Sequence, residues 1–142
     1  MSSPEERTAA AVGETMFARD SASQALGMVL EEVRPGYARL RMTVRPDMLN
    51  GHGTCHGGLV FALADSAFAF ACNSHDVVTV AAGCSIEFLE PAHAGDELVA
   101  VAEERFREGR NGVYDVEVRR DGGGLVATFR GRSASTRERV LG

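Results

Sequence analysis

A glycine pair at the start of an apolar stretch is the first feature suited to chemistry. Gly57 and Gly58 directly precede a run of apolar residues that ends near residue 73. At the start of a helix, such glycines leave backbone N–H groups uncovered by side chains, and these unpaired donors carry the positive end of the helix dipole. They are suited to a carbonyl oxygen that becomes negative during a reaction. Alternatively, the glycines only relieve crowding where the helix meets the preceding strand.

An acid in the middle of the same run is the second feature. Asp65 has Leu63, Ala64, Ala67 and Phe68 as neighbours, so a helix here buries it. Burying a lone carboxylate costs on the order of several kcal/mol unless the group has a partner. The acid therefore predicts either a catalytic base or nucleophile, or a structural hydrogen bond to a neighbouring loop.

The spacing of these two features limits how they can work together. Gly57 and Asp65 are eight residues apart, which is about 12 Å along a helix. A reacting carbonyl has to lie within about 3 Å of both the oxyanion donor and the base or nucleophile. One chain cannot supply both groups from this pair, whereas two antiparallel helices related by a two-fold axis can. If the residues are catalytic, the sequence predicts a homodimer that shares its active sites.

The other polar residues of the turn have competing interpretations. His52 and His56 are four residues apart, but a glycine between them disfavours a regular helix and no third metal ligand lies nearby. Cys55 beside His56 has the types of a thiol nucleophile and its base, but no acid or amide is placed to orient the histidine. Asn50 begins an Asn-Gly pair, which is a frequent turn dipeptide. We therefore expect no metal site here.

Two helices are expected to frame these residues. Ser3 is suited to cap a helix, Pro4 fits its first turn and Glu6 completes a capping box, which predicts a helix over 4–19. Its apolar stripe is thin, so we expect it to pack on the surface of the main body. The second helix, over 59–73, is apolar on nearly every side, and a helix of this kind is buried on every side.

Six runs bounded by turn signals predict the strands of one antiparallel sheet. They span 26–33, 37–44, 77–89, 97–107, 113–120 and 125–136. The second run alternates between apolar and polar residues, so it has one dry face and pairs with the first run as a hairpin. The predicted class is α+β, the hot-dog fold, in which a six-stranded antiparallel sheet wraps around one long apolar helix. The sheet covers only part of the helix, so a second subunit is expected to bury the rest.

The composition is that of an ordinary globular protein. The chain has 142 residues, of which 44% are hydrophobic and 25% charged. We expect a single domain over 1–142, with an N-terminal helical extension at 1–22 and a hot-dog core at 23–137. The net charge is −5 and no basic stripe appears, so nucleic acid is not an expected partner.

Membrane association and an oxidising compartment are also not expected. The first residues lack the basic start and apolar stretch of a secretory signal. The longest apolar run, 59–72, is shorter than the roughly 20 residues that cross a bilayer, and it contains Asp65. The three cysteines, Cys55, Cys72 and Cys84, are odd in number and lack metal-type spacing. We expect reduced thiols in a cytoplasmic protein.

The segment that carries these features resembles a known family. The run from Asn50 to Asn73 is similar to the signature of the phenylacetate-degradation (PaaI-type) acyl-CoA thioesterases, and the similarity extends over about residues 25–136. It continues through 82–92, Gly95-Asp96 and 109–116. The resemblance implies hydrolysis of aryl- or hydroxyaryl-acetyl-CoA esters to free acid and coenzyme A without a metal. It also implies a homotetramer built from two hot-dog dimers.

The resemblance further implies roles for single residues. The Gly57 N–H polarises the thioester carbonyl, and Asp65 of the facing subunit attacks that carbonyl or activates a water. Asn50 holds the water or the acyl carbonyl, His56 supports the turn, and Ser66 contacts the water or the acyl group.

Contacts with the rest of the substrate are expected elsewhere. An arginine in an exposed turn can meet a phosphate, so Arg110, with Asn111 and Gly112, is the expected site for coenzyme A. His52 and Gly58 complete the expected substrate-binding set. Coenzyme A enters as part of the substrate, and no separate cofactor is expected.

Two other functions fit parts of the pattern. A non-catalytic acyl-CoA-binding protein on the same fold would not need a buried acid. An acyl-CoA hydratase or dehydratase would need a histidine paired with the acid, and the helix has none. The sequence leaves open the acyl group, the choice between nucleophile and base for Asp65, and the pairing of dimers.

Overall fold

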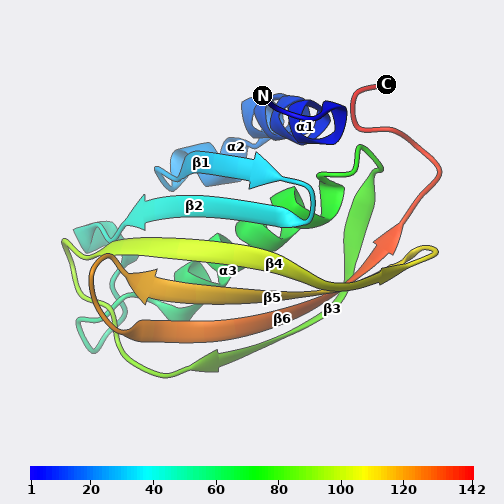
Figure 1. Ribbon diagram of the computed structural model, residues 1–142. Helices are drawn as coiled ribbons and strands as arrows, with labels where there is room; N and C mark the ends of the chain where they lie inside the picture. The colour runs from blue at the N-terminus through cyan, green and yellow to red at the C-terminus, as the bar shows by residue number, and fades with distance from the viewer.

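A six-stranded antiparallel sheet curls around a single long helix, α3, in the computed structural model, which describes residues 1–142 (Figure 1). The order of the strands across the sheet is β1-β2-β4-β5-β6-β3. The strands are β1 (Val29–Arg34), β2 (Tyr37–Thr43), β3 (Thr79–Phe88), β4 (Glu97–Glu108), β5 (Asn111–Arg120) and β6 (Leu125–Ser135). The helices are α1 (Pro4–Arg19), α2 (Ser21–Ala25), the 3-10 helix η1 (Pro46–Met48) and α3 (Gly57–Asn73). The predicted wrapping of one sheet around one apolar helix is confirmed.

The core lies between α3 and the concave face of the sheet. The apolar residues of β2 alternate with polar ones, and Ala38, Leu40 and Met42 are fully buried. From α3, the ring of Phe68 packs against the strands so closely that a Cβ added at Gly131 of β6 would lie 2.7 Å from it. Glycine at this position is therefore needed because the aromatic ring occupies the place of a side chain.

Helix α1 packs at the edge of the sheet beside β1, as its thin apolar stripe predicts (Figure 1). Ser3 and Glu6 form the expected reciprocal capping box at its start. It buries only Ala9, Val12 and Gly13.

The observed elements differ from the predicted ones in the segment before β1 and at the start of α3. The first strand begins at Val29, three residues later than predicted, because the chain first forms α2 and then turns at Gly27 with a φ of 71°. The five-residue helix α2 was not predicted, since it is too short to show a helical period. Helix α3 begins at Gly57, so both glycines of the pair lie inside its first turn.

Two surfaces of the fold are poorly covered. Strand β3 is an edge strand that pairs only with β6, and Val80 and Phe88 on it are 54% and 55% exposed. One stripe of α3 is only half-buried, although the rest of the helix lies in the core. The stripe consists of Leu59, Ala62, Asp65, Ser66 and Ala69. No helix in the structure is long and apolar enough to cross a membrane.

Candidate active site

The first turn of α3 leaves one backbone donor free. His56 caps the helix, and its Nδ1 accepts a hydrogen bond from the Gly58 N–H at 3.0 Å. The N–H groups of Leu59 and Val60 both donate to the His56 carbonyl oxygen, at 2.9 and 3.3 Å. The N–H of Gly57 has no partner in the chain. It is the one donor at the positive end of the helix dipole that is available to a ligand.

His56 therefore supports the helix start through its side chain. Since Nδ1 accepts a hydrogen bond, the proton of the neutral imidazole is on Nε2. The structure does not pair Cys55 with His56 as a thiol nucleophile and its base. The Cys55 Sγ lies 3.7 Å from the His56 carbonyl oxygen and makes no hydrogen bond to the imidazole ring. Burial raises the pKa of the Cys55 thiol. This arrangement does not activate Cys55 as a nucleophile.

The loop before α3 is closed by Asn50. Its Oδ1 accepts from the backbone N–H groups of His52 at 2.9 Å and Thr54 at 3.2 Å, and its Nδ2 donates to the Thr54 hydroxyl at 3.0 Å. One hydrogen of the amide group remains without a partner. His52 itself is exposed at the tip of the loop. Asn50 thus shapes the turn, and it retains one donor for a ligand.

Asn50 and Gly57 line a cavity of about 330 Å³ whose walls are mainly apolar. The apolar walls come from α3, from the end of β3 and the segment that follows it, and from β6. They include Val60, Phe88, Leu89, Pro91, Ala92 and Val126. The ring of Phe88 lies over the helix start, and a Cβ at Gly57 would be 3.2 Å from its Cζ. A side chain at residue 57 would therefore crowd the Phe88 ring beside the free N–H.

Asp65 lies outside this cavity, as the spacing along α3 predicts. It is half-buried and has no hydrogen bond or ion pair within the chain. Burial raises the pKa of its carboxyl above the usual range, and the negative charge of Asp20 adds to this rise. An unpaired acid with a raised pKa in a partly closed setting is typical of a functional group. The structure does not bring it to the Gly57 of the same chain.

Ser66 is hydrogen-bonded to a residue that the sequence did not indicate. Its Oγ lies 2.9 Å from Oγ of Ser23 in α2. Ser23 in turn donates to Asp20, at 2.6 Å. The only signal in the sequence was an aspartate three residues before a serine, which is the pattern of a helix cap.

The turn between β4 and β5 lies at the opposite end of α3 from Gly57. Arg110 and Asn111 line a polar cavity of about 220 Å³ together with Arg107, and neither guanidinium forms an ion pair. Gly112 stands next to it, where a Cβ would meet the Ser133 hydroxyl at 2.6 Å. Within one chain, these residues and the Gly57 cavity are therefore separate.

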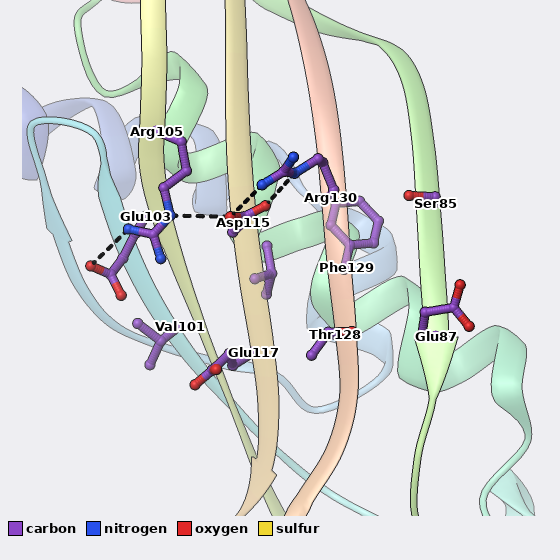
Figure 2. Close-up of a pocket in the computed structure, with 11 residues that line it drawn as sticks. Ser85, Glu87, Val101, Glu103, Arg105, Asp115, Glu117, Thr128, Phe129 and Arg130 are labelled. Carbon is purple, nitrogen blue, oxygen red and sulfur yellow. Dashed lines mark hydrogen bonds and ion pairs between the residues drawn. The ribbon is translucent and has the colours of Figure 1, made fainter.

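A third cavity, of about 360 Å³, lies on the outer face of the sheet (Figure 2). Arg105 and Arg130 both reach toward Asp115 in its centre, at 3.1 and 2.7 Å (Figure 2). The hydrogen bonds from Arg130, and then those from Arg105, lower the pKa of Asp115. These charges satisfy one another, and the sheet separates them from α3. This cavity therefore has no part in the candidate site.

Comparison with known proteins identifies the family. A family model described as the thioesterase superfamily matches residues 52–127, which contain both Gly57 and Asp65. The chain belongs to the thioesterase superfamily. This thioesterase is 47% identical, over 118 residues, to the acyl-coenzyme A thioesterase PaaI of Escherichia coli, covering 83% of this chain and 84% of that protein.

Solved structures agree with this family. The structure of the E. coli PaaI protein from the phenylacetic acid degradation operon matches with a TM-score of 0.93 at 42% identity, over 94% of this chain and 97% of that one. A hypothetical thioesterase from Streptococcus pneumoniae, solved with coenzyme A, matches with a TM-score of 0.76 at 25% identity, over 79% and 90% of the two chains. The prediction of a PaaI-type hot-dog thioesterase is confirmed. The roles of single residues stay predictions.

Proposed function

We propose that this thioesterase hydrolyses acyl-CoA thioesters to free acid and coenzyme A, and that it prefers aryl- or hydroxyaryl-acetyl groups such as phenylacetyl. The likeness to E. coli PaaI supports the substrate class, and the coenzyme A in the pneumococcal structure supports the leaving group. The mainly apolar walls of the Gly57 cavity suit an aromatic acyl group.

The free Gly57 N–H is the observation that carries this proposal. A thioester carbonyl becomes an oxyanion when a nucleophile adds to it, and a fixed N–H at a helix start stabilises that charge. The peptide dipoles of the 17 residues of α3 are aligned, and the positive end of the helix dipole lies at this N–H. The neighbouring N–H groups are already paired, so the oxyanion has one defined position.

Asp65 is proposed to act at the Gly57 of a second subunit. Three observations support a homodimer: the edge strand β3 carries only one charged residue, Glu87, the stripe of α3 is half-buried, and Asp65 is unpaired. An edge of this length with a single charge pairs readily with another strand. The small residues of the stripe allow a second α3 to approach closely. An antiparallel arrangement of the two helices then places each Asp65 at the partner's helix start. The pairing of two dimers into a homotetramer stays a prediction.

The raised pKa of Asp65 fits proton transfer. A base works best when its pKa is close to the operating pH. In the general-base route, Asp65 takes a proton from water and the hydroxide adds to the carbonyl carbon. The intermediate then expels the thiolate, which receives the proton from Asp65. In the nucleophilic route, the Asp65 carboxylate adds to the carbonyl carbon and the C–S bond breaks to release the thiolate. Water then hydrolyses the mixed anhydride to the free acid and supplies the proton for the thiolate, which restores the Asp65 carboxylate. Both routes use the same Gly57 donor.

The phosphates of coenzyme A are proposed to bind at the β4–β5 turn. The free guanidinium groups of Arg107 and Arg110 and the amide of Asn111 line one cavity there. This cavity lies near Cys72, seven residues beyond Asp65, or about 10 Å along α3. A thioester held between Asp65 and the partner's Gly57 can thus extend its pantetheine arm toward the arginines of the Asp65 subunit.

A panel of coenzyme A thioesters tests the proposed function. Release of free thiol is followed with a thiol-reactive dye, with an enzyme-only blank because Cys84 is exposed. Phenylacetyl-CoA and hydroxyphenylacetyl-CoA should give the highest kcat/KM values. Asp65→Asn should lower kcat roughly a hundred- to ten-thousandfold. Asp121→Asn, at an exposed position in the β5–β6 turn, is the matched control and should keep wild-type activity.

The same panel separates the alternatives. Saturable binding without turnover for every ester would replace the proposed function with that of an acyl-CoA-binding protein. Consumption of an enoyl-CoA without thiol release would indicate a hydratase.

A further inference from the structure

A row of three hydrogen-bonded side chains connects the α1–α2 junction to α3. The carboxyl of Asp20 accepts from the Ser23 backbone N–H at 3.0 Å through Oδ1, and from the Ser23 hydroxyl at 2.6 Å through Oδ2. The Ser23 Oγ also lies 2.9 Å from the Ser66 Oγ, although the two serines are 43 positions apart. Ser23 is only 2% exposed. Water therefore cannot easily compete for the hydrogen bonds of Ser23, the middle residue of the row.

The direction of these hydrogen bonds follows from chemistry. A carboxylate only accepts, so the single hydroxyl proton of Ser23 points to Asp20. At the contact between the serines, Ser23 can then only accept and Ser66 must donate. The hydroxyl proton of Ser66 is thus used in the hydrogen bond to Ser23, and the Ser66 Oγ can only accept from any other neighbour, through its two lone pairs.

We infer that Asp20 and Ser23 are positioning residues that hold the Ser66 hydroxyl as a fixed hydrogen-bond acceptor beside Asp65, where the two orient the hydrolytic water. Ser66 directly follows Asp65, and both belong to the half-buried stripe of α3, which the rest of the chain covers only in part. This inference rests on the proposed thioester hydrolysis.

The row explains how one water can be aimed. A water between Asp65 and Ser66 donates one hydrogen to the carboxylate and the other to the Ser66 Oγ, so its lone pair points away from both. When Asp65 takes its proton, the O–H adds to the thioester carbonyl carbon and the C–S bond breaks. The leaving thiolate then receives that proton from Asp65. No proton moves along the row, which only maintains the orientation.

Asp20 has a second effect, through its charge. It raises the pKa of Asp65 together with burial. The other titratable groups that sense Asp65 are Cys72 of α3 and Cys84 of β3, and burial raises the pKa of both thiols, that of Cys72 to about 12. Within the chain, Asp20 is therefore the charged group that shifts the titration of Asp65.

Ser23→Ala removes the row but keeps the charge of Asp20. We expect kcat for phenylacetyl-CoA to fall roughly three- to tenfold, with KM and the acid limb of the pH profile unchanged. Ser66→Ala should lower kcat similarly, and adding Ser23→Ala to it should cause no further loss, because Ser23 acts only through Ser66. Ser21→Ala, at an exposed position of the same helix, is the matched control and should behave as wild type.

Asp20→Asn should reverse the donor and acceptor roles in this row of hydrogen bonds. Asparagine caps a helix as well as aspartate, so its oxygen keeps the Ser23 N–H and its NH2 group faces the Ser23 hydroxyl. Ser23 then accepts from the amide and donates to Ser66. We expect kcat to fall as in Ser23→Ala, and the acid limb to move to lower pH because a negative charge near Asp65 is lost.

The outcomes are distinct. Wild-type kcat in both Ser23→Ala and Asp20→Asn, full additivity of the two serine variants, or an unchanged acid limb in Asp20→Asn would each overturn the inference. Absence of turnover in the wild-type enzyme would instead refute the proposed function. Thermal unfolding of each variant shows whether the fold is kept, and the serine cycle remains informative if Asp20→Asn is unstable.

Discussion

A mixture of two inactive variants should recover activity if the active site is shared. Gly57→Val blocks the donor, because even a Cβ at this position lies 3.2 Å from the Phe88 ring, yet it keeps Asp65. Asp65→Asn removes the acid and keeps Gly57. Each variant alone should fall to about a hundredth of wild-type activity or less.

The expected recovery follows from the geometry. The two groups lie about 12 Å apart along one α3, so an intact site takes Gly57 from one chain and Asp65 from the other. Random reassociation makes about half of the dimers hybrids. Each hybrid combines the good Asp65 of one variant with the good Gly57 of the other in one of its two sites. The mixture should therefore reach about a quarter of wild-type activity.

The assay uses subunits with two different tags, refolded together, with hybrids counted by native mass spectrometry. A mixture of differently tagged Asp65→Asn subunits is the control and should gain nothing. If the site were contained in one chain, a hybrid would hold one site without its donor and one without its acid. Confirmed hybrids with no more activity than their parents would refute the shared site.

Three further predictions concern titration, packing and substrate contact. The pKa of Asp65 is raised in the folded chain, so ionisation of its carboxyl destabilises the fold as pH rises through that pKa. Asp65→Asn should therefore raise Tm at neutral pH, and an unchanged or lower Tm would contradict the raised pKa. Activity should fall as pH drops through the same pKa. Gly131→Ala, whose Cβ would lie 2.7 Å from the Phe68 ring, should cost about 1–3 kcal/mol in urea unfolding; a neutral result would show that the ring can move. Arg110→Ala should raise KM several-fold at low salt with little change in kcat, while Arg137→Ala in the C-terminal segment should not; equal effects would exclude a specific phosphate contact.

The local signals in the sequence predicted most elements correctly. The capping box at Ser3 and the alternation in 37–44 depend on residues close together in the chain, so their structural meaning is local. The short helix α2 was not predicted, because five residues are too few to show a helical period. The contact of Ser23 with Ser66 escaped because it joins residues far apart in sequence, which no local pattern encodes.

The sequence by itself determined that Gly57 and Asp65 cannot serve one site within one chain, because the rise per residue of a helix is constant. Only the tertiary structure decided which donor is free. The N–H groups of Gly57 and Gly58 are equivalent in the sequence, and the fold assigns the second to the His56 side chain. The tertiary structure likewise decided that Asp65 has no partner in the chain and that the charge of Asp20 raises its pKa, since hydrogen bonds and electric fields depend on which segments meet in space.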